Sequence, residues 1–331
     1  MAPTVVDMAR AIVLVAHAAD PRIRAIYLQE LSSRADVRFL ADLSESDRTS
    51  RLQEARVLLT FSPDRELSAS ELQALAHTPF VQCLAAGRDR FPFELFETSS
   101  VAFNPGAAAG PIAEHALAMV LAAAKNLQPR QRELSQGVFN QSAMNMRLDG
   151  GTAVVLGLGA IGSRVASLLQ AFGMKVRGVN RTGHTRHPVD LCVTLENLDA
   201  ALDQADVLVI AAELNAQTEN AIGERQLRLL KPDAILVNVS RAAVVQQADL
   251  FQHLQRNPGF RACLDVWWTE PMHAGGFALD FPFLDLPNVL GSPHNSPMVP
   301  GIFGDLALAA SRNAARFLDG DVPLHVGSSR M

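Results

Sequence analysis

The sequence predicts an α/β protein with two doubly wound units, each a parallel sheet covered by helices. Two observations predict this class. Short apolar runs alternate with helix-like stretches, and the alternation occurs twice along the chain. The 331 residues are 48% hydrophobic and 19% charged, which provides enough apolar material for two cores and is unlike a disordered chain.

The first alternation runs from residue 11 to residue 104. Its apolar runs predict strands at 11–16, 37–40, 56–60, 81–85 and 101–104, with helices at 21–33 and 68–76. A strong helix follows at Pro111–Lys125, which begins with Pro and is rich in Ala and Leu. The polar stretch 126–151 is either an exposed connection or an arm that contacts a partner subunit.

The second alternation begins at Thr152. Strands are expected at 152–156, 175–179, 206–211, 234–239, 261–266 and 288–291, with helices such as 161–171 and 247–255 between them. Gly304–Leu318 carries apolar residues on one face and predicts a C-terminal amphipathic helix.

Composition narrows the class of protein further. The formal net charge of −5 disfavours a general nucleic-acid binder. Cys83, Cys192 and Cys263 form neither a disulfide framework nor a metal site, and their apolar neighbours predict buried thiols in a reducing, cytoplasmic setting. We expect no metal, because the cysteines lack metal-ligand spacing. We expect no membrane segment, because the apolar run at 11–18 is too short to span a bilayer.

A glycine-rich turn follows the strand at 152–156. Its sequence is Gly157-Leu158-Gly159-Ala160-Ile161-Gly162, and it opens a helix. In this context Gly157 permits the tight turn, Gly159 lets the backbone approach a pyrophosphate, and Gly162 allows close packing of helix and strand. Amides at the helix start, including those of Ala160 and Ile161, then face the phosphates. The motif predicts a dinucleotide-binding domain of Rossmann type.

The next strand ends in Asn180-Arg181-Thr182, where an NAD-binding domain usually has an acidic residue. A carboxylate would repel a 2′-phosphate, whereas Arg181 can bind one and Thr182 adds a hydroxyl. We therefore expect NADP(H) to be preferred. The alternative is that Arg181 is a surface arginine near the adenine and that NAD(H) also binds.

Three later segments carry candidate catalytic residues. They are Val237–Arg241, Leu264–Pro271 and Ser292–Asn295. Arg241 and Asp265 follow strands at their carboxyl ends, where open α/β sheets bind ligands. Glu270 and His294 lie in loops beyond such ends.

With these motifs the sequence resembles the D-isomer-specific 2-hydroxyacid dehydrogenase family over nearly its whole length, and the glyoxylate/hydroxypyruvate reductase branch in particular. The resemblance rests on Ala85–Asp89, Ala113-Glu114-His115, the glycine turn, Lys231-Pro232 leading to Arg241, Asp265 to Glu270-Pro271, and Pro293-His294. It implies a flavodoxin-like substrate domain (1–103 and 296–331) with the Rossmann-type domain (104–295) inserted in it.

The resemblance also implies a role for each residue. Arg241 binds the substrate, and its planar fork suits a carboxylate with an adjacent keto oxygen. His294 is the acid/base and Glu270 the partner that holds it. Ala86 and Gly87 hold the substrate carboxylate through backbone amides. Val239 and Asp265 join the cofactor site, with Asp265 near the nicotinamide carboxamide, whereas His115 is expected to be structural.

The implied activity is reduction of small 2-oxo acids, such as glyoxylate or hydroxypyruvate, to D-2-hydroxy acids by a homodimer that pairs through 111–151. Two alternatives stay open. One is an NAD-dependent, phosphoglycerate dehydrogenase-like enzyme, for which only Arg88 and Arg90 supply extra basic residues. The other is a non-catalytic protein that senses nucleotides, which would bind cofactor and reduce nothing.

Overall fold

The computed structural model describes residues 10–271 and 275–327. The chain divides into two compact units: unit 1 contains residues up to 108 and from 300 onward, and unit 2 contains residues 109–299. The boundaries expected from the sequence, after residues 103 and 295, lie a few residues before these.

Unit 1 contains a six-stranded sheet in the order β13-β5-β4-β3-β1-β2. Strands β1 to β5 are parallel and have the flavodoxin-like order 2-1-3-4-5, while β13 is antiparallel to β5. Their bounds are β1 Ala11–Val15, β2 Ala35–Phe39, β3 Ala55–Thr60, β4 Phe80–Cys83, β5 Ser100–Ala102 and β13 Val326–Gly327.

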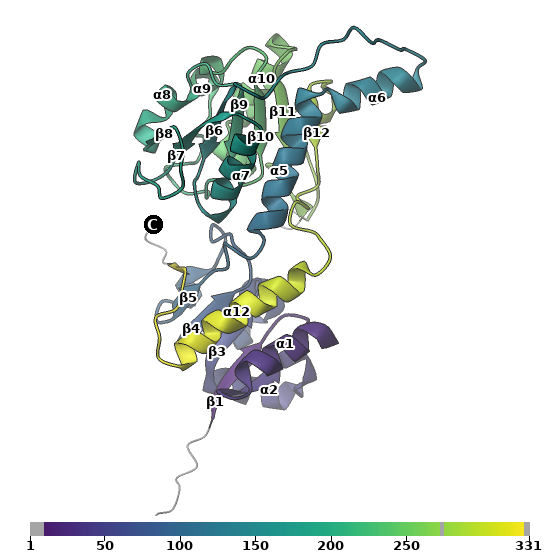
Figure 1. Cartoon of the computed structure of the whole chain (residues 1–331). Helices are drawn as coiled ribbons and strands as arrows, with labels where there is room; N and C mark the ends of the chain where they lie inside the picture. The colour runs from purple at the N-terminus through teal and green to yellow at the C-terminus, as the bar shows by residue number, and fades with distance from the viewer. Residues whose placement is uncertain (1–9, 272–274, 328–331) are drawn as a thin grey trace, which may run out of the picture. The chain divides into compact units, whose positions relative to one another are not determined.

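Helices cover both faces of this sheet (Figure 1). The helices of unit 1 are α1 Pro21–Leu31, α2 Glu45–Glu54, α3 Pro63–Glu66, α4 Ala69–Ala74 and α12 Ile302–Leu318. Tyr27 of α1 and Ala310 of α12 belong to the core on one face, and Leu52 of α2 and Leu72 of α4 belong to the core on the other. The central strands are buried on both sides, which is why they read as continuous apolar runs.

Unit 2 contains a seven-stranded parallel sheet in the order β12-β11-β10-β9-β6-β7-β8. Counted within the unit, this is the Rossmann order 3-2-1-4-5-6 with one further edge strand. The bounds are β6 Thr152–Leu156, β7 Lys175–Val179, β8 Leu191–Val193, β9 Val207–Ile210, β10 Ile235–Asn238, β11 Arg261–Leu264 and β12 Val289–Gly291.

The helices of unit 2 are α5 Ala109–Ala124, α6 Leu127–Ser135, α7 Ala160–Ala171, α8 Leu198–Leu202, α9 Glu224–Leu229 and α10 Gln247–Arg256. Helix α5 packs against α7 and against strands β10 and β11. Helix α6 and the segment after it extend away from the body of unit 2 (Figure 1). The polar stretch 126–151 therefore begins with a helix that its composition did not predict.

The structure confirms the predicted fold class of two doubly wound α/β units. It also corrects some details. Strands β8 and β13 were not expected, because β8 is an edge strand that is only partly buried and β13 has two residues. Cys83 and Cys263 are buried as predicted, but Cys192 lies in β8 and is partly exposed. Within the described residues, no helix is both long and apolar enough to cross a membrane.

Candidate active site

The candidate site residues of unit 2 gather at one edge of its sheet. All seven strands run the same way, so their carboxyl ends lie together. The glycine turn follows β6, Asn180 follows β7, Arg241 follows β10, Asp265 follows β11, and the segment that leads to His294 follows β12. Strands β7 and β8 are added on one side of β6, and strands β9 to β12 on its other side. Open α/β sheets bind ligands at such a switch point in strand order, here between β6 and β9.

The glycine turn is shaped by close approach of backbone segments. Gly157 has φ +95°, and a Cβ there would lie 2.5 Å from the Ala212 amide nitrogen. A Cβ on Gly162 would lie 1.7 Å from the Gly157 carbonyl oxygen, so helix α7 contacts the turn directly. These two positions accept only glycine for reasons of packing within the protein itself.

Gly159 differs, because a Cβ built there meets no atom within 4 Å. Gly159 is the N-cap of α7, and the first amide to bond back along the helix is that of Ser163, to the Gly159 carbonyl at 2.9 Å. Amides ahead of it, such as those of Ala160, Ile161 and Gly162, lack an intrahelical acceptor by helix geometry. Open space before a helix N-terminus with free donors fits a pyrophosphate.

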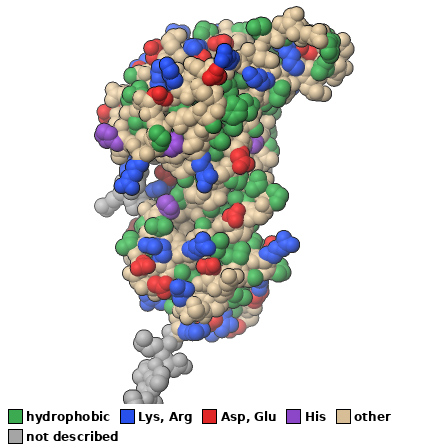
Figure 2. Space-filling model, in the orientation of Figure 1, with side chains coloured by type: hydrophobic (Ala, Val, Ile, Leu, Met, Phe, Trp, Pro, Cys, Tyr) green, Lys and Arg blue, Asp and Glu red, His purple; other side chains and the backbone are tan. Residues whose placement is uncertain are grey.

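The loop after β7 is organised by the Asn180 side chain. Its Oδ1 accepts the amides of Thr182 (3.1 Å) and Gly183 (2.7 Å), and its Nδ2 donates to the His184 carbonyl at 2.7 Å. Asn180 thus closes a turn whose tip exposes Arg181 and Thr182. Figure 2 shows arginine or lysine and histidine side chains along the left margin of unit 2, near β7 and β8.

Hydrogen bonds hold the backbone around Arg241, at the end of β10. The buried Asn238 side chain donates to the Arg241 carbonyl at 2.9 Å and accepts the Ser240 amide at 3.0 Å. Arg241 Nη1 donates to the Ser240 carbonyl at 2.9 Å. Val239 beside it is buried, and its amide donates to the Ile210 carbonyl of β9.

Glu270 and His294 form a hydrogen-bonded pair. His294 Nδ1 lies 2.9 Å from Glu270 Oε2, and the side chains are 33% and 11% exposed. Glu270 Oε1 accepts the Trp267 amide at 2.9 Å. Burial alone would raise the pKa of Glu270, but the two hydrogen bonds and the charges of His294 and Arg241 hold it below its ordinary value. Glu270 therefore stays ionised at neutral pH and orients the imidazole.

Asp265 is fully buried. Its Oδ1 accepts the Ser292 hydroxyl at 2.5 Å and the Asn295 amide at 3.2 Å, and its Oδ2 accepts the Ser296 amide at 3.2 Å. These partners are all in the segment that carries His294. A contact of Asp265 with the nicotinamide stays a prediction.

The structure thus brings Arg241, Glu270, His294 and Asp265 together in unit 2. Ala86 and Gly87 lie in unit 1, in the loop after β4, and their contact with the substrate stays a prediction. No motif of the sequence indicates Ser292, and His115 is expected there to be structural, yet His115 Nε2 lies 3.0 Å from the Ser292 hydroxyl. Only the position of Ser292, two residues before His294, could have drawn attention to it.

The chain as a whole is similar to known proteins. Residues 117–296 match the model of the D-isomer-specific 2-hydroxyacid dehydrogenase family, NAD-binding domain. The chain is 30% identical to a glyoxylate reductase of Aeropyrum pernix over 284 residues, which is 83% of each chain. The chain belongs to the D-isomer-specific 2-hydroxyacid dehydrogenase family. It is therefore an NAD(P)-dependent oxidoreductase, and its family acts on small 2-oxo and 2-hydroxy acids.

A second relative agrees with this membership, and a solved structure shares the fold. The chain is 30% identical to glyoxylate/hydroxypyruvate reductase B of Pectobacterium atrosepticum over 258 residues, covering 75% of this chain and 79% of that one. The NAD complex of a D-isomer-specific 2-hydroxyacid dehydrogenase from Lactobacillus delbrueckii ssp. bulgaricus has the same fold. Its TM-score is 0.78 at 18% identity, with 96% of this chain and 100% of that chain covered.

Single substitutions at two glycines of the turn distinguish an effect on stability from an effect on cofactor binding. Gly162→Ala is expected to destabilise the protein by roughly 1–3 kcal/mol through overpacking, because its methyl group meets the Gly157 carbonyl. Gly159→Ala should lower the melting temperature less than Gly162→Ala does, because the methyl group meets no atom and only the N-cap of α7 becomes poorer. It should weaken NADPH binding, because the methyl group enters the space before α7. Thermal unfolding without cofactor and a fluorescence titration with NADPH measure the two effects. Native NADPH affinity in Gly159→Ala would contradict the assignment of the phosphate site.

Proposed function

We propose that this enzyme reduces small 2-oxo acids, such as glyoxylate and hydroxypyruvate, to D-2-hydroxy acids and prefers NADPH. The observation that carries the proposal is the 2.9 Å bond between His294 Nδ1 and Glu270 Oε2, beside Arg241 at the carboxyl edge of the sheet. This arrangement can bind a carboxylate and protonate a carbonyl oxygen, and the glyoxylate reductase relatives share the chain's family.

The protein's own residues would act as follows. Arg241 binds the carboxylate and the keto oxygen with its planar fork. Glu270 holds the imidazole through Nδ1, so that Nε2 faces the substrate and donates its proton to the keto oxygen. When bound, the reduced nicotinamide supplies the hydride that carbon 2 receives. One hydride and one proton convert the 2-oxo acid to the 2-hydroxy acid.

The loop after β7 supports a preference for NADPH. Asn180 brings no negative charge to the position where an acidic residue would bind the ribose hydroxyls of NAD. Its amide instead fixes a turn that exposes Arg181 and Thr182, a guanidinium and a hydroxyl suited to a phosphate. His184 and Arg186 are exposed in the same loop and add to the basic character of this margin.

Two other functions are weighed against this proposal. A D-3-phosphoglycerate dehydrogenase of Archaeoglobus fulgidus is 31% identical over 191 residues, but the match covers only 35% of that protein. A pure nucleotide sensor would not need a charged Glu270 to hold His294. The paired Glu270 and His294 therefore favour turnover.

Initial rates at 340 nm test the reaction. Purified enzyme with NADPH is expected to reduce glyoxylate or hydroxypyruvate faster than bulkier 2-oxo acids. His294→Ala should lower kcat by roughly 10²–10⁴-fold, because the proton donor is removed. NADPH binding by the variant serves as the control for folding. No turnover on any 2-oxo acid by wild-type protein that binds NADPH would favour the sensor.

Asn180→Asp tests the cofactor preference. The carboxylate still accepts the amides of Thr182 and Gly183, but its charge repels a 2′-phosphate. We expect the ratio of kcat/KM for NADPH to that for NADH to fall roughly tenfold or more, which corresponds to about 1.4 kcal/mol. Asn257→Asp, which adds the same charge where α10 ends, is the matched control. An unchanged ratio contradicts the assignment, and an equal loss with both cofactors indicates a damaged turn.

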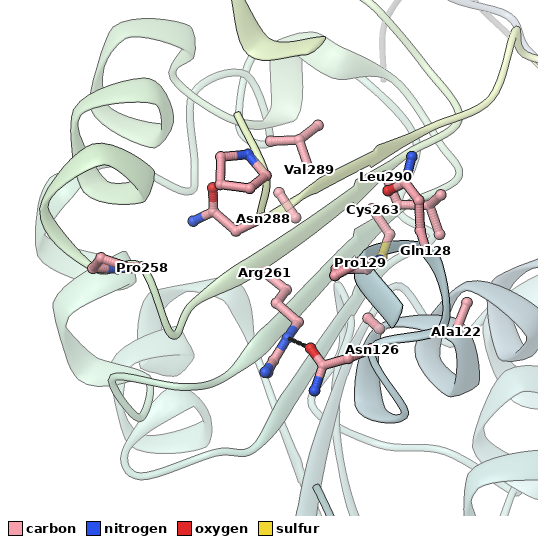
Figure 3. A pocket seen from close by; sticks show the side chains of 13 residues that line it. Ala122, Asn126, Gln128, Pro129, Pro258, Arg261, Cys263, Asn288, Val289 and Leu290 are labelled. Atoms are coloured by element: carbon pink, nitrogen blue, oxygen red, sulfur yellow. Dashed lines mark hydrogen bonds between the residues drawn. The ribbon is translucent and has the colours of Figure 1, made fainter. Parts of the chain in front are cut away.

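We further propose that the enzyme is a homodimer that pairs through residues 111–151. The arm beyond α5 exposes large apolar side chains, including Phe139 at 75% and Met144 at 87%. At its base lies a hollow of about 190 Å³, between the α5–α6 junction and the amino ends of β11 and β12 (Figure 3). There Arg261 Nε donates to Asn126 Oδ1 at 2.9 Å. A second copy would cover these apolar surfaces.

Light scattering after size exclusion tests this assembly. Wild-type enzyme is expected to have the mass of two chains at micromolar concentration. The double substitution Phe139→Ser and Met144→Ser should shift the equilibrium toward monomer, because it removes apolar area from the interface. Leu28→Ser, at an exposed leucine of α1 in unit 1, should leave the mass unchanged. A wild-type monomer at working concentration would remove the proposal.

A further inference from the structure

A chain of polar side chains lies behind the pair of His294 and Glu270. His115 is in the middle of α5, Asp265 follows β11, and Ser292 follows β12. Ser292 Oγ donates to Asp265 Oδ1 at 2.5 Å and lies 3.0 Å from His115 Nε2. His115 Nε2 is also 3.7 Å from Asp265 Oδ1. None of these three groups is required to touch the substrate in the proposed reaction.

The hydrogen atoms in this chain can be assigned. A serine hydroxyl has one hydrogen, and that of Ser292 points to Asp265. The Nε2 of His115 must then be the donor to Ser292 Oγ, so this nitrogen carries a proton. Asp265 acts only as an acceptor, since the amides of Asn295 and Ser296 donate to it as well. The direction of donation is therefore His115 to Ser292 to Asp265.

The hydrogen bonds that link His115, Ser292 and Asp265 hold the backbone on both sides of His294. Ser292 lies two residues before it, and Asn295 and Ser296 come directly after it. His294 itself has φ +52°, in the left-handed region that non-glycine residues seldom adopt. Such a conformation persists where the surrounding contacts determine it. The bonds to Asp265 supply those contacts, and they set the direction in which the imidazole leaves the backbone.

We propose that His115 and Ser292 are positioning residues for His294, which act on it through Asp265. The inference rests on the proposed function, because it assumes that His294 is the proton donor. It gives Asp265 a role within the protein that does not depend on contact with the cofactor.

The expected kinetic effect falls on turnover. Ser292→Ala and His115→Leu should each lower kcat roughly ten- to a hundredfold, the range caused by misplacing a catalytic group by about 1 Å. KM for NADPH and for glyoxylate should change less than about twofold, because binding groups stay in place. His115→Gln keeps a side-chain N–H donor and should recover most of the lost kcat. Ser167→Ala, at a hydroxyl on α7 that donates to the Ser163 carbonyl of the same helix, is the control.

A double variant distinguishes positioning from general destabilisation. When Ser292→Ala is added to His294→Ala, no further loss of kcat is expected, because the residue that it positions is already absent. Losses that multiply in full would overturn the proposal. Wild-type kcat in both Ser292→Ala and His115→Leu would overturn it as well, while leaving the proposed reaction intact.

Amide hydrogen exchange provides a readout that needs no turnover. The amides of Asn295 and Ser296 donate to Asp265, so they should exchange faster in Ser292→Ala than in wild-type protein, with the melting temperature of the two proteins compared in parallel. Unchanged exchange at both amides would overturn the positioning role even if the enzyme proved to act on another substrate. Failure of the wild-type enzyme to reduce any 2-oxo acid would instead contradict the proposed function.

Discussion

The arrangement of the site depends on the hydrogen bonds that the buried carboxylate of Asp265 accepts. This carboxylate has no exposed surface, yet it accepts three hydrogen bonds from Ser292, Asn295 and Ser296. A buried carboxyl group without hydrogen-bond partners is costly, so the donors that satisfy Asp265 are held in place. Because these donors flank His294, the hydrogen bonds that satisfy this buried carboxylate also hold the backbone on both sides of His294. Removal of the donors would therefore disturb the histidine before it disturbed the sheet.

The direction of the strands places this carboxylate where it can act. Asp265 follows β11, and its amide donates to the carbonyl of Asn238 at the end of β10. The Asn238 side chain in turn holds the backbone of Ser240 and Arg241. Two neighbouring strand ends thus fix the arginine and the histidine segment against each other. Groups held by strand ends are set more precisely than groups on free loops, which matters because small displacements are costly in catalysis.

The sequence predicted those parts of the protein in which local pattern and tertiary environment agree. Strands such as β6 and β9 are buried on both faces and appear as apolar runs, and the glycine turn has a packing reason at Gly157 and Gly162. The motifs indicate Arg241, Glu270 and His294 as candidate catalytic residues, and the structure places them at one edge of the sheet. The pairing of Ser292 with His115 could not be predicted, because it joins residues 177 positions apart through a fold that no local pattern encodes. The sequence also did not predict strand β8, because an edge strand is only partly buried and needs few apolar residues.

Asn180 illustrates how one side chain can serve the fold and also bear on the proposed cofactor preference. Its amide oxygen accepts two backbone amides and its amide nitrogen donates to a carbonyl four residues later, so both ends of the amide are used in closing the turn. An aspartate could accept the two amides but could not donate to the carbonyl. The turn therefore favours Asn over Asp at this position for a structural reason that does not depend on any cofactor. The neutrality of Asn also removes the repulsion that a carboxylate would exert on a 2′-phosphate, so the turn that presents Arg181 is compatible with NADPH by its construction.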